Sequence, residues 1–239
     1  MKRPLQLFWA ALIYTLTLPL AVLPYRISLK VGALIGELAF HLWTQRREIA
    51  VDNIKRAIET GALKGELTAH ELARRCFRNL GRSLMEVLKI YHGFGEVVFR
   101  NTEIEGIEHF REAMNKGKGV LLITGHCGNW ELLALYSSFR VTPLKVVARA
   151  LNNPFLNRLV ERTRGRYGNR VIYKEGALRQ MIRELRGGGA VGILIDQGVL
   201  PSEGVKIPFL GRPAWTMRTP AVLATKTGAG VVPVFIKRT

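Results

Sequence analysis

The chain has 239 residues, of which 48% are hydrophobic, and a formal net charge of +18 at pH 7. This length favours one domain with a full core, since two domains would be cramped. Its two cysteines, Cys76 and Cys127, give no disulfide framework and fit a reducing compartment. The positive charge predicts anionic partners, such as a membrane surface, acidic proteins or phosphorylated substrates. No nucleic-acid partner is expected, because the basic residues are dispersed and no recognised binding motif is present.

Residues 1–25 are predicted to form a membrane anchor. Leu5 to Tyr25 is strongly apolar, and about 20 such residues can cross the hydrocarbon core of a bilayer. A signal peptide is the first alternative, but no small-x-small cleavage site follows the apolar run. A buried core helix is the second. More positive charges follow the segment than precede it, so the positive-inside rule predicts a cytoplasmic body. The charges that follow are Arg26, Lys30, Arg46 and Arg47.

Residues 26–100 are expected to form a helical part. Apolar residues recur at helical spacing over Ile27–Trp43, and Arg46–Ile58 reads as a basic amphipathic helix. Thr68-x-x-Glu71 is a capping box, which predicts a helix that runs to about Ile90.

From Thr102 the pattern changes to alternating strands and helices, which is typical of an α/β fold. We expect a mixed central sheet flanked by helices over residues 101–239, with residues 26–239 as one globular unit. A helix is predicted over roughly Thr219–Thr227. The strand candidates are Ile104, Val120–Thr124, Leu144–Ala150, Val171–Tyr173, Ala190–Ile195, Val205–Leu210 and Val231–Ile236.

The stretch G-H-C-G-N-W-E, residues 125–131, carries the strongest chemical signal. If His126 lies in the turn after a strand and Glu131 lies in the first turn of the next helix, the two side chains can converge. Glu131 would then accept a hydrogen bond from one imidazole nitrogen and leave the other free as a general base. Gly128 allows close backbone approach to a substrate, and Asn129 is a candidate cap. The helix start also offers N–H donors to an oxyanion or phosphate.

Other interpretations of this stretch stay open. His126 could be a satisfied turn histidine, with Glu131 as a helix-start acid that favours the dipole. A zinc site from His126, Cys127 and Glu131 lacks a second His or Cys at ligand spacing. Cys127 as a nucleophile is disfavoured, because the side chains of adjacent residues usually diverge. We therefore expect no metal.

The chain resembles the bacterial late acyltransferases of lipid A biosynthesis, the lauroyl/myristoyl transferase family. That family lies within the glycerolipid acyltransferase superfamily, which is marked by His-x4-Asp/Glu. The resemblance covers about Arg46 to Arg238 and implies a glycerolipid acyltransferase-like fold. It rests on G-H-C-G-N-W-E, R-A-L-N-N-P, I-L-I-D-Q, V-K-I-P-F-L-G-R-P-A and G-A-G-V-V-P-V-F-I-K-R, which occur in that order.

The resemblance implies transfer of a fatty acyl group from acyl carrier protein or coenzyme A to a hydroxyl of a lipid A precursor. The acceptor is a phosphorylated glycolipid, and the enzyme would sit at the cell inner membrane, facing the cytoplasm. His126 and Glu131 would form the catalytic dyad, with no metal or redox cofactor. Members usually continue beyond the last block, so either the sequence is truncated at Thr239 or the segment that is missing contributes nothing to the dyad. The acyl-chain pocket and the membrane contacts are therefore expected to be incomplete. The substrate-binding residues would be Gly128, Asn129, Arg149, Arg164, Asp196 and Gln197, with Arg149 at the acceptor phosphate.

Three rival functions remain. The acceptor could be another glycolipid, such as a mannosylated phosphoinositide, or a lysophospholipid. The protein could also bind lipid without turnover, or it could pass the acyl group to water as a hydrolase.

Overall fold

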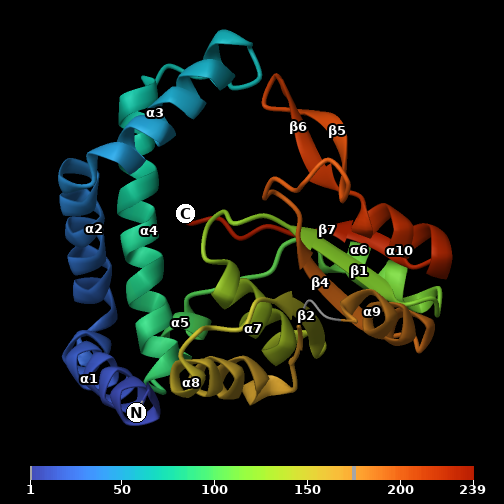
Figure 1. The fold of residues 1–239 in the computed structure, drawn as a ribbon, viewed down its shortest axis with the longest axis horizontal. Coiled ribbons are helices and arrows are strands. Elements are labelled where there is room, and N and C mark those ends of the chain that lie inside the picture. The colour runs from blue at the N-terminus through green and yellow to red at the C-terminus, as the bar shows by residue number, and fades with distance from the viewer. Residues whose placement is uncertain (1, 174–175) are drawn as a thin grey trace.

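The computed structural model describes residues 2–173 and 176–239, and its N-terminal helices stand beside an α/β core (Figure 1). The helices are α1 (Lys2–Val22), α2 (Tyr25–Leu42), α3 (Thr44–Glu59), α4 (Ala69–Tyr91), α5 (Glu96–Arg100), α6 (Ile107–Asn115), α7 (Trp130–Arg140), α8 (Pro154–Arg164), the 3₁₀ turn η1 (Gly165–Tyr167), α9 (Ala177–Arg186) and α10 (Thr219–Thr227). The strands are β1 (Val120–Thr124), β2 (Leu144–Ala148), β3 (Arg170–Tyr173), β4 (Ala190–Leu194), β5 (Gly204–Phe209), β6 (Arg212–Met217) and β7 (Gly230–Pro233).

The central sheet has five strands in the order β3-β2-β4-β1-β7, and every pairing is parallel. The expectation of a mixed sheet is therefore wrong for this part of the chain. The segment Val205–Leu210 does form a strand, but it pairs antiparallel with β6 in a separate two-stranded ribbon. Ile104, another strand candidate, lies outside any strand. Parallel pairing needs a crossover between neighbouring strands, and helices supply it, for example α8 between β2 and β3.

The core lies on both faces of this sheet. Leu121 and Val191 pack in a cluster on one face, and Val120 and Leu122 pack in a second cluster on the other. Successive strand residues point to opposite faces, so a strand covered on both sides is apolar throughout. The run V-L-L-I-T of β1 has this character, and the strand is fixed in the centre of the molecule.

Helix α4 runs beside α2 and joins the helical part to α7 and α8 of the α/β core (Figure 1). Its predicted capping box is confirmed: the Thr68 hydroxyl accepts from the Glu71 N–H, and the Glu71 carboxylate accepts from the Thr68 N–H. The two helices approach so closely at Gly36 and Gly81 that a Cβ at either would meet the backbone of the other helix. Substitution there should force the helices apart.

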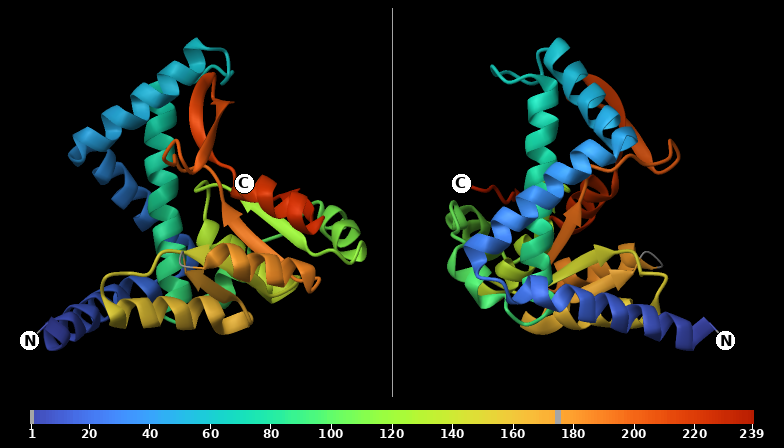
Figure 2. Two further views of the ribbon diagram at one scale, coloured as in Figure 1. Left: turned by 45° about the vertical axis from the view of Figure 1, so that its right-hand side comes forward. Right: turned by 90° about the vertical axis from the view of Figure 1, so that its left-hand side faces the viewer.

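Helix α1 projects away from the body (Figure 2). Its segment Arg3–Val22 has a mean hydropathy of 1.7 and is long and apolar enough to cross a membrane, with only 11% of its apolar window buried. A core helix would be mostly buried. The apolar residues that it exposes include Leu5, Phe8, Trp9, Ile13, Leu16 and Val22.

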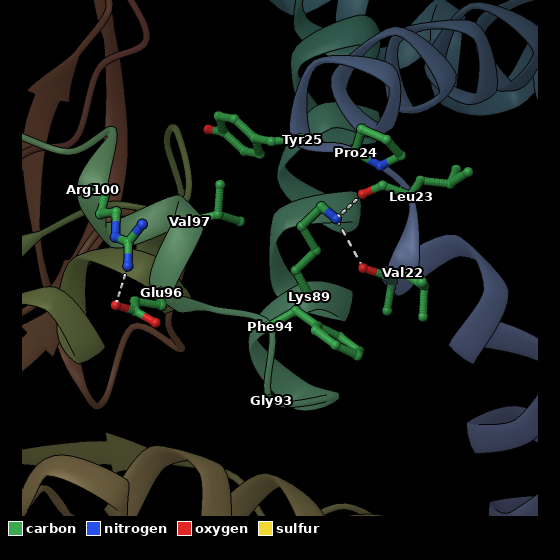
Figure 3. Close-up of a pocket in the computed structure, with 11 residues that line it drawn as sticks. Val22, Leu23, Pro24, Tyr25, Lys89, Gly93, Phe94, Glu96, Val97 and Arg100 are labelled. Atoms are coloured by element: carbon green, nitrogen blue, oxygen red, sulfur yellow. Dashed lines mark hydrogen bonds and ion pairs between the residues drawn. The ribbon is translucent and has the colours of Figure 1, made fainter.

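The base of α1 is tied to α4 by a buried lysine. The Lys89 ammonium donates to the carbonyls of Ala21, at 2.8 Å, and Leu23, at the end of α1 (Figure 3). Partial burial lowers the pKa of Lys89. A cavity of about 370 Å³ opens beside this contact, and none of the predicted site residues line it. The junction therefore fixes the direction of α1 and lies apart from the candidate site.

Candidate active site

The candidate site lies at the carboxyl ends of β1 and β4, which are neighbours in the sheet. Thr124 pairs with Leu194 at the last step of the ladder, and the Ile195 N–H donates to the Thr124 carbonyl at 2.9 Å. His126 and Asp196 each follow these ends by two residues. Because the strands are parallel and in register, the two side chains emerge at the same edge, where ligand sites of parallel sheets gather.

Asp196 holds His126 by two hydrogen bonds. Its Oδ1 lies 2.8 Å from His126 Nδ1, and its Oδ2 accepts from the His126 backbone N–H at 2.7 Å. An ionised carboxylate can only accept, so Nδ1 carries the proton and Nε2 is the basic nitrogen. The Gln197 amide nitrogen lies 3.4 Å from Nε2, and about a third of the histidine side chain is exposed. Nε2 therefore belongs to a partly exposed side chain, and a substrate hydroxyl that reached it would take the place of the Gln197 amide.

The electrostatics of this pair favour an ionised Asp196. Partial burial would raise the pKa of its carboxyl group, but the hydrogen bonds from the His126 ring and backbone outweigh burial and lower it. Gly125 makes room for the carboxylate, because a Cβ there would lie 3.1 Å from Asp196 Oδ2. Glycine at this position thus allows Asp196 to reach the backbone of the turn that carries His126.

Glu131 is engaged elsewhere. Its carboxylate accepts two hydrogen bonds from the Arg164 guanidinium of α8: one from Nε, at 3.0 Å, and one from Nη2. Burial would lower the pKa of Arg164, but the contact with Glu131 raises it. The expected hydrogen bond between His126 and Glu131 is thus replaced by two separate pairs. The physical reason is that the first turn of α7 directs Glu131 toward α8, whereas β4 brings Asp196 to His126.

The loop between His126 and Glu131 is tightly fixed. Asn129 caps α7 as predicted, its Oδ1 accepting from the Leu132 N–H at 3.1 Å, and its Nδ2 donates to Glu86 of α4 at 2.9 Å. Gly128 has φ +60°, and a Cβ there would collide with the Ile236 carbonyl. Only glycine suits both the backbone conformation and the close approach.

Arg149 stands apart from these contacts. It follows β2, which pairs with β4, and its side chain is exposed to solvent at the same edge of the sheet as His126 and Asp196. The structure thus brings together His126, Asp196 and Gln197, pairs Glu131 with Arg164, and leaves Arg149 facing solvent.

A second basic feature was not predicted. A hollow of about 630 Å³ beside α4, here called the arginine hollow, is lined by five arginines together with Glu71, Asn79 and Thr239. The arginines are Arg74, Arg75, Arg78, Arg82 and Arg238. Partial burial and the nearby charges of Arg238 and Arg78 lower the pKa of Arg82. Three of these arginines already meet carboxylates within the chain: Arg74 and Arg78 bind Glu37, and Arg238 binds Glu86.

Sequence reasoning also missed Glu86, the partner of Asn129. Its signal was an acidic residue inside the apolar run L-M-E-V-L of residues 84–88, because a buried carboxylate needs partners. As for metals, the described ranges 2–173 and 176–239 bring no three His, Cys, Asp or Glu together in a way that could hold one.

The fold and site define a class: an α/β protein that presents a histidine, held by a carboxylate through Nδ1, at the carboxyl edge of a parallel sheet. The family model described as "Bacterial lipid A biosynthesis acyltransferase" matches residues 3–239. The chain therefore belongs to this acyltransferase family, as its motifs indicated.

Individual relatives are consistent with this assignment. The chain is 27% identical over 218 residues to the lipid A biosynthesis lauroyltransferase of Escherichia coli (strain K12), covering 90% of this chain and 69% of the relative. It is 26% identical over 220 residues to the palmitoleoyltransferase of the same organism, with the same coverage. A phosphatidylinositol mannoside acyltransferase of Mycolicibacterium smegmatis is 27% identical over 135 residues, 55% of this chain and 44% of that relative.

Proposed function

We propose that this chain moves a fatty acyl group from an acyl thioester to a hydroxyl of a lipid A precursor, with His126 as the general base. The observation that carries the proposal is the His126–Asp196 pair, which leaves Nε2 basic on a partly exposed side chain in a member of the lipid A acyltransferase family.

In the proposed reaction, His126 Nε2 takes the proton of the acceptor hydroxyl as its oxygen attacks the thioester carbonyl. Asp196 accepts the Nδ1–H throughout and stabilises the imidazolium that forms. Collapse of the tetrahedral intermediate breaks the carbon–sulfur bond, and the imidazolium returns the proton to the leaving sulfur. The products are an ester and a free thiol, and a base so placed typically accelerates a reaction by about 10²–10⁴-fold.

The tetrahedral oxyanion needs donors, and we assign this role to the backbone N–H groups of Gly128 and Asn129. Glu131 enters as a positioning residue: with Arg164 it fixes the first turn of α7 against α8, directly after the loop that carries these donors. This assignment replaces the His126–Glu131 dyad by a His126–Asp196 dyad with Glu131 behind the loop.

The charge of the chain supports anionic substrates. A net charge of +18, the exposed Arg149 and the arginine hollow all suit a phosphorylated acceptor, and the donor, acyl carrier protein or coenzyme A, is also acidic. We place α1 in the inner membrane, with the catalytic edge on the cytoplasmic side. Each basic residue near an anionic lipid surface contributes about 1 kcal/mol to attraction.

Transfer of a labelled acyl group from acyl carrier protein to a phosphorylated lipid A precursor tests the proposal, with His126→Ala beside the native chain. Transfer by the native chain alone, with acceptor binding retained in the variant, is expected. Turnover by the variant at the native rate would contradict the base assignment.

A mannosylated phosphoinositide is the second acceptor to test, because part of the chain is similar to a phosphatidylinositol mannoside acyltransferase. A lysophospholipid and water complete the panel. Efficient transfer to one of these, with none to the lipid A precursor, would support the role of His126 as general base but show that the acceptor is a different molecule. Binding of lipid without transfer to any acceptor would contradict the enzymatic proposal and support a lipid-binding protein.

A further inference from the structure

A buried carboxylate on α4 joins three distant parts of the chain. Glu86 is 2% exposed. Its Oε1 accepts from the Tyr25 hydroxyl and from Arg238 Nη1, and its Oε2 accepts from Arg238 Nη2 and Asn129 Nδ2; these four distances lie between 2.8 and 2.9 Å. The partners come from the start of α2, the segment after β7 and the catalytic loop.

Two of these partners connect Glu86 to the catalytic loop: Asn129 belongs to the loop, and Arg238 follows the segment that packs against it. Asn129 ends the loop and caps α7, so the hydrogen bond from its Nδ2 to Glu86 also fixes which way its amide points. Arg238 lies two residues beyond Ile236, whose carbonyl packs against Gly128. Glu86 therefore closes a clamp in which residues 128–129 lie between α4 and the segment after β7.

The clamp needs a charged carboxylate. An ionised carboxylate offers about four acceptor positions, and Glu86 uses all of them. A glutamine of the same shape has one acceptor oxygen, and its NH₂ group would face donors from Arg238 or Asn129. The carboxylate is kept ionised in place: burial would raise the pKa of Glu86, but Arg238 and Asn129 lower it below the ordinary value.

We propose that Glu86 is a positioning residue of the catalytic loop: through Asn129 and Arg238 it holds the Gly128 and Asn129 backbone N–H groups where the oxyanion forms. This inference rests on the proposed function. Misplacing such donors weakens transition-state stabilisation more than substrate binding, so the role is visible in kcat rather than in KM.

Glu37 provides a matched control for Glu86. The Glu37 carboxylate is partly buried and binds two arginines of α4, Arg74 and Arg78. Like Glu86, it therefore binds arginine and connects α2 to α4. None of its hydrogen-bond partners lies in the catalytic loop. Glu86→Gln and Glu37→Gln therefore both weaken a carboxylate–arginine contact made by α4, but only the first releases the loop.

The experiment measures kcat, KM and thermal stability for acyl transfer by the full chain and both variants. We expect Glu86→Gln to lower kcat roughly 10- to 100-fold with KM changed by less than about threefold, the size expected when donors are misplaced. Glu37→Gln should lower stability while keeping the native kcat. Equal kcat in the two variants at a matched folded fraction would overturn the proposal.

A second variant covers the case in which Glu86→Gln does not fold. Asn129→Ser keeps a good helix cap but is too short to reach Glu86, and it leaves the contacts of Glu86 with Tyr25 and Arg238 in place. It should lower kcat to a similar extent. A native kcat in a folded Asn129→Ser protein would also refute the role of the clamp.

Hydrogen exchange separates this inference from the proposed function, because it needs no turnover. Amides of residues 126–133 should exchange faster in Glu86→Gln than in Glu37→Gln. If the native chain transfers no acyl group to any acceptor, the proposed function fails, and the exchange result alone decides the clamp. Identical exchange in both variants would contradict it.

Discussion

Two carboxylates stand close to the β1–α7 turn, and they are held in different ways. Asp196 meets a titratable partner, His126, at an edge of the sheet where both side chains are about a third exposed. Glu131 meets a permanently charged partner, Arg164, and both of these side chains are about a fifth exposed. In the proposed function the first pair exchanges a proton with the acceptor, whereas the second pair fixes a helix. The two carboxylates therefore differ in the partner that they bind and in how far they are exposed, rather than in their distance from the turn.

The largest expected effect comes from Asp196→Asn. The amide keeps the size of the side chain but can donate to Nδ1, which would move the imidazole proton to Nε2 and remove the free base. We expect kcat to fall by about 10²–10⁴-fold with little change in acceptor KM. Steady-state kinetics on the folded variant give the answer. A kcat near the native value would remove Asp196 from the mechanism.

Glu131→Gln should act mainly on stability, because it leaves the Arg164 charge without its partner. A double-mutant cycle with Arg164→Gln isolates the pair, and we expect a coupling free energy of about 1–3 kcal/mol in denaturant unfolding. Coupling near zero would show that the two side chains do not act as a pair in solution.

The pH dependence of the free energy of unfolding tests whether the carboxylates of Asp196 and Glu86 are held in the folded state. Asp196 and Glu86 both have lowered pKa values in the folded state, so each stabilises the fold above its unfolded pKa and loses that contribution as the pH falls through the folded pKa. The ordinary values are 3.8 and 4.5, so stability should hold above about pH 4.5 and decline below it. Asp196→Asn should make the free energy of unfolding less steep in acid, as measured by urea unfolding from pH 2 to 6. An unchanged slope would mean that the carboxylate is not held in the folded state.

The smallest effect is expected for Arg149→Gln, since Arg149 is exposed and the structure gives it no hydrogen-bonded partner among the described residues. Unfolding should stay within about 0.5 kcal/mol of the native chain, as for most surface changes. Acceptor KM should rise several-fold and depend less on salt, because an exposed charge acts on an anion through screened attraction. An unchanged KM would separate Arg149 from the acceptor.

Much of the fold could be predicted from local sequence patterns. The capping box at Thr68, the Asn129 cap and the helix Thr219–Thr227 follow from side-chain chemistry within a few residues, and all three are confirmed. The strand Arg212–Met217 was missed because it carries Pro213, and proline in a sequence indicates a turn. Proline is tolerated here because β6 pairs only with β5, so it is an edge strand.

The site depended on long-range order that no local pattern contains. Asp196 reaches His126 across 70 residues because β1 and β4 pair in register, and that register is a property of the whole sheet. His126 lies two residues beyond the expected strand Val120–Thr124 and Asp196 lies one residue beyond the expected strand Ala190–Ile195, so parallel pairing of these strands would have placed the pair together. Glu86 was harder to find, since its partners lie 43, 61 and 152 residues away.

The pairing of His126 with Asp196 is tested most directly by the tautomer of His126. NMR of the ¹⁵N-labelled imidazole reads it in the folded chain, at a pH where the ring is neutral. The His126 signal is assigned by its loss in His126→Ala. Because Asp196 accepts from Nδ1, we expect a proton on Nδ1 in the native chain and in Glu131→Gln, and a proton on Nε2 in Asp196→Asn. A native chain protonated on Nε2, or a tautomer that responds to Glu131 and not to Asp196, would contradict this pairing.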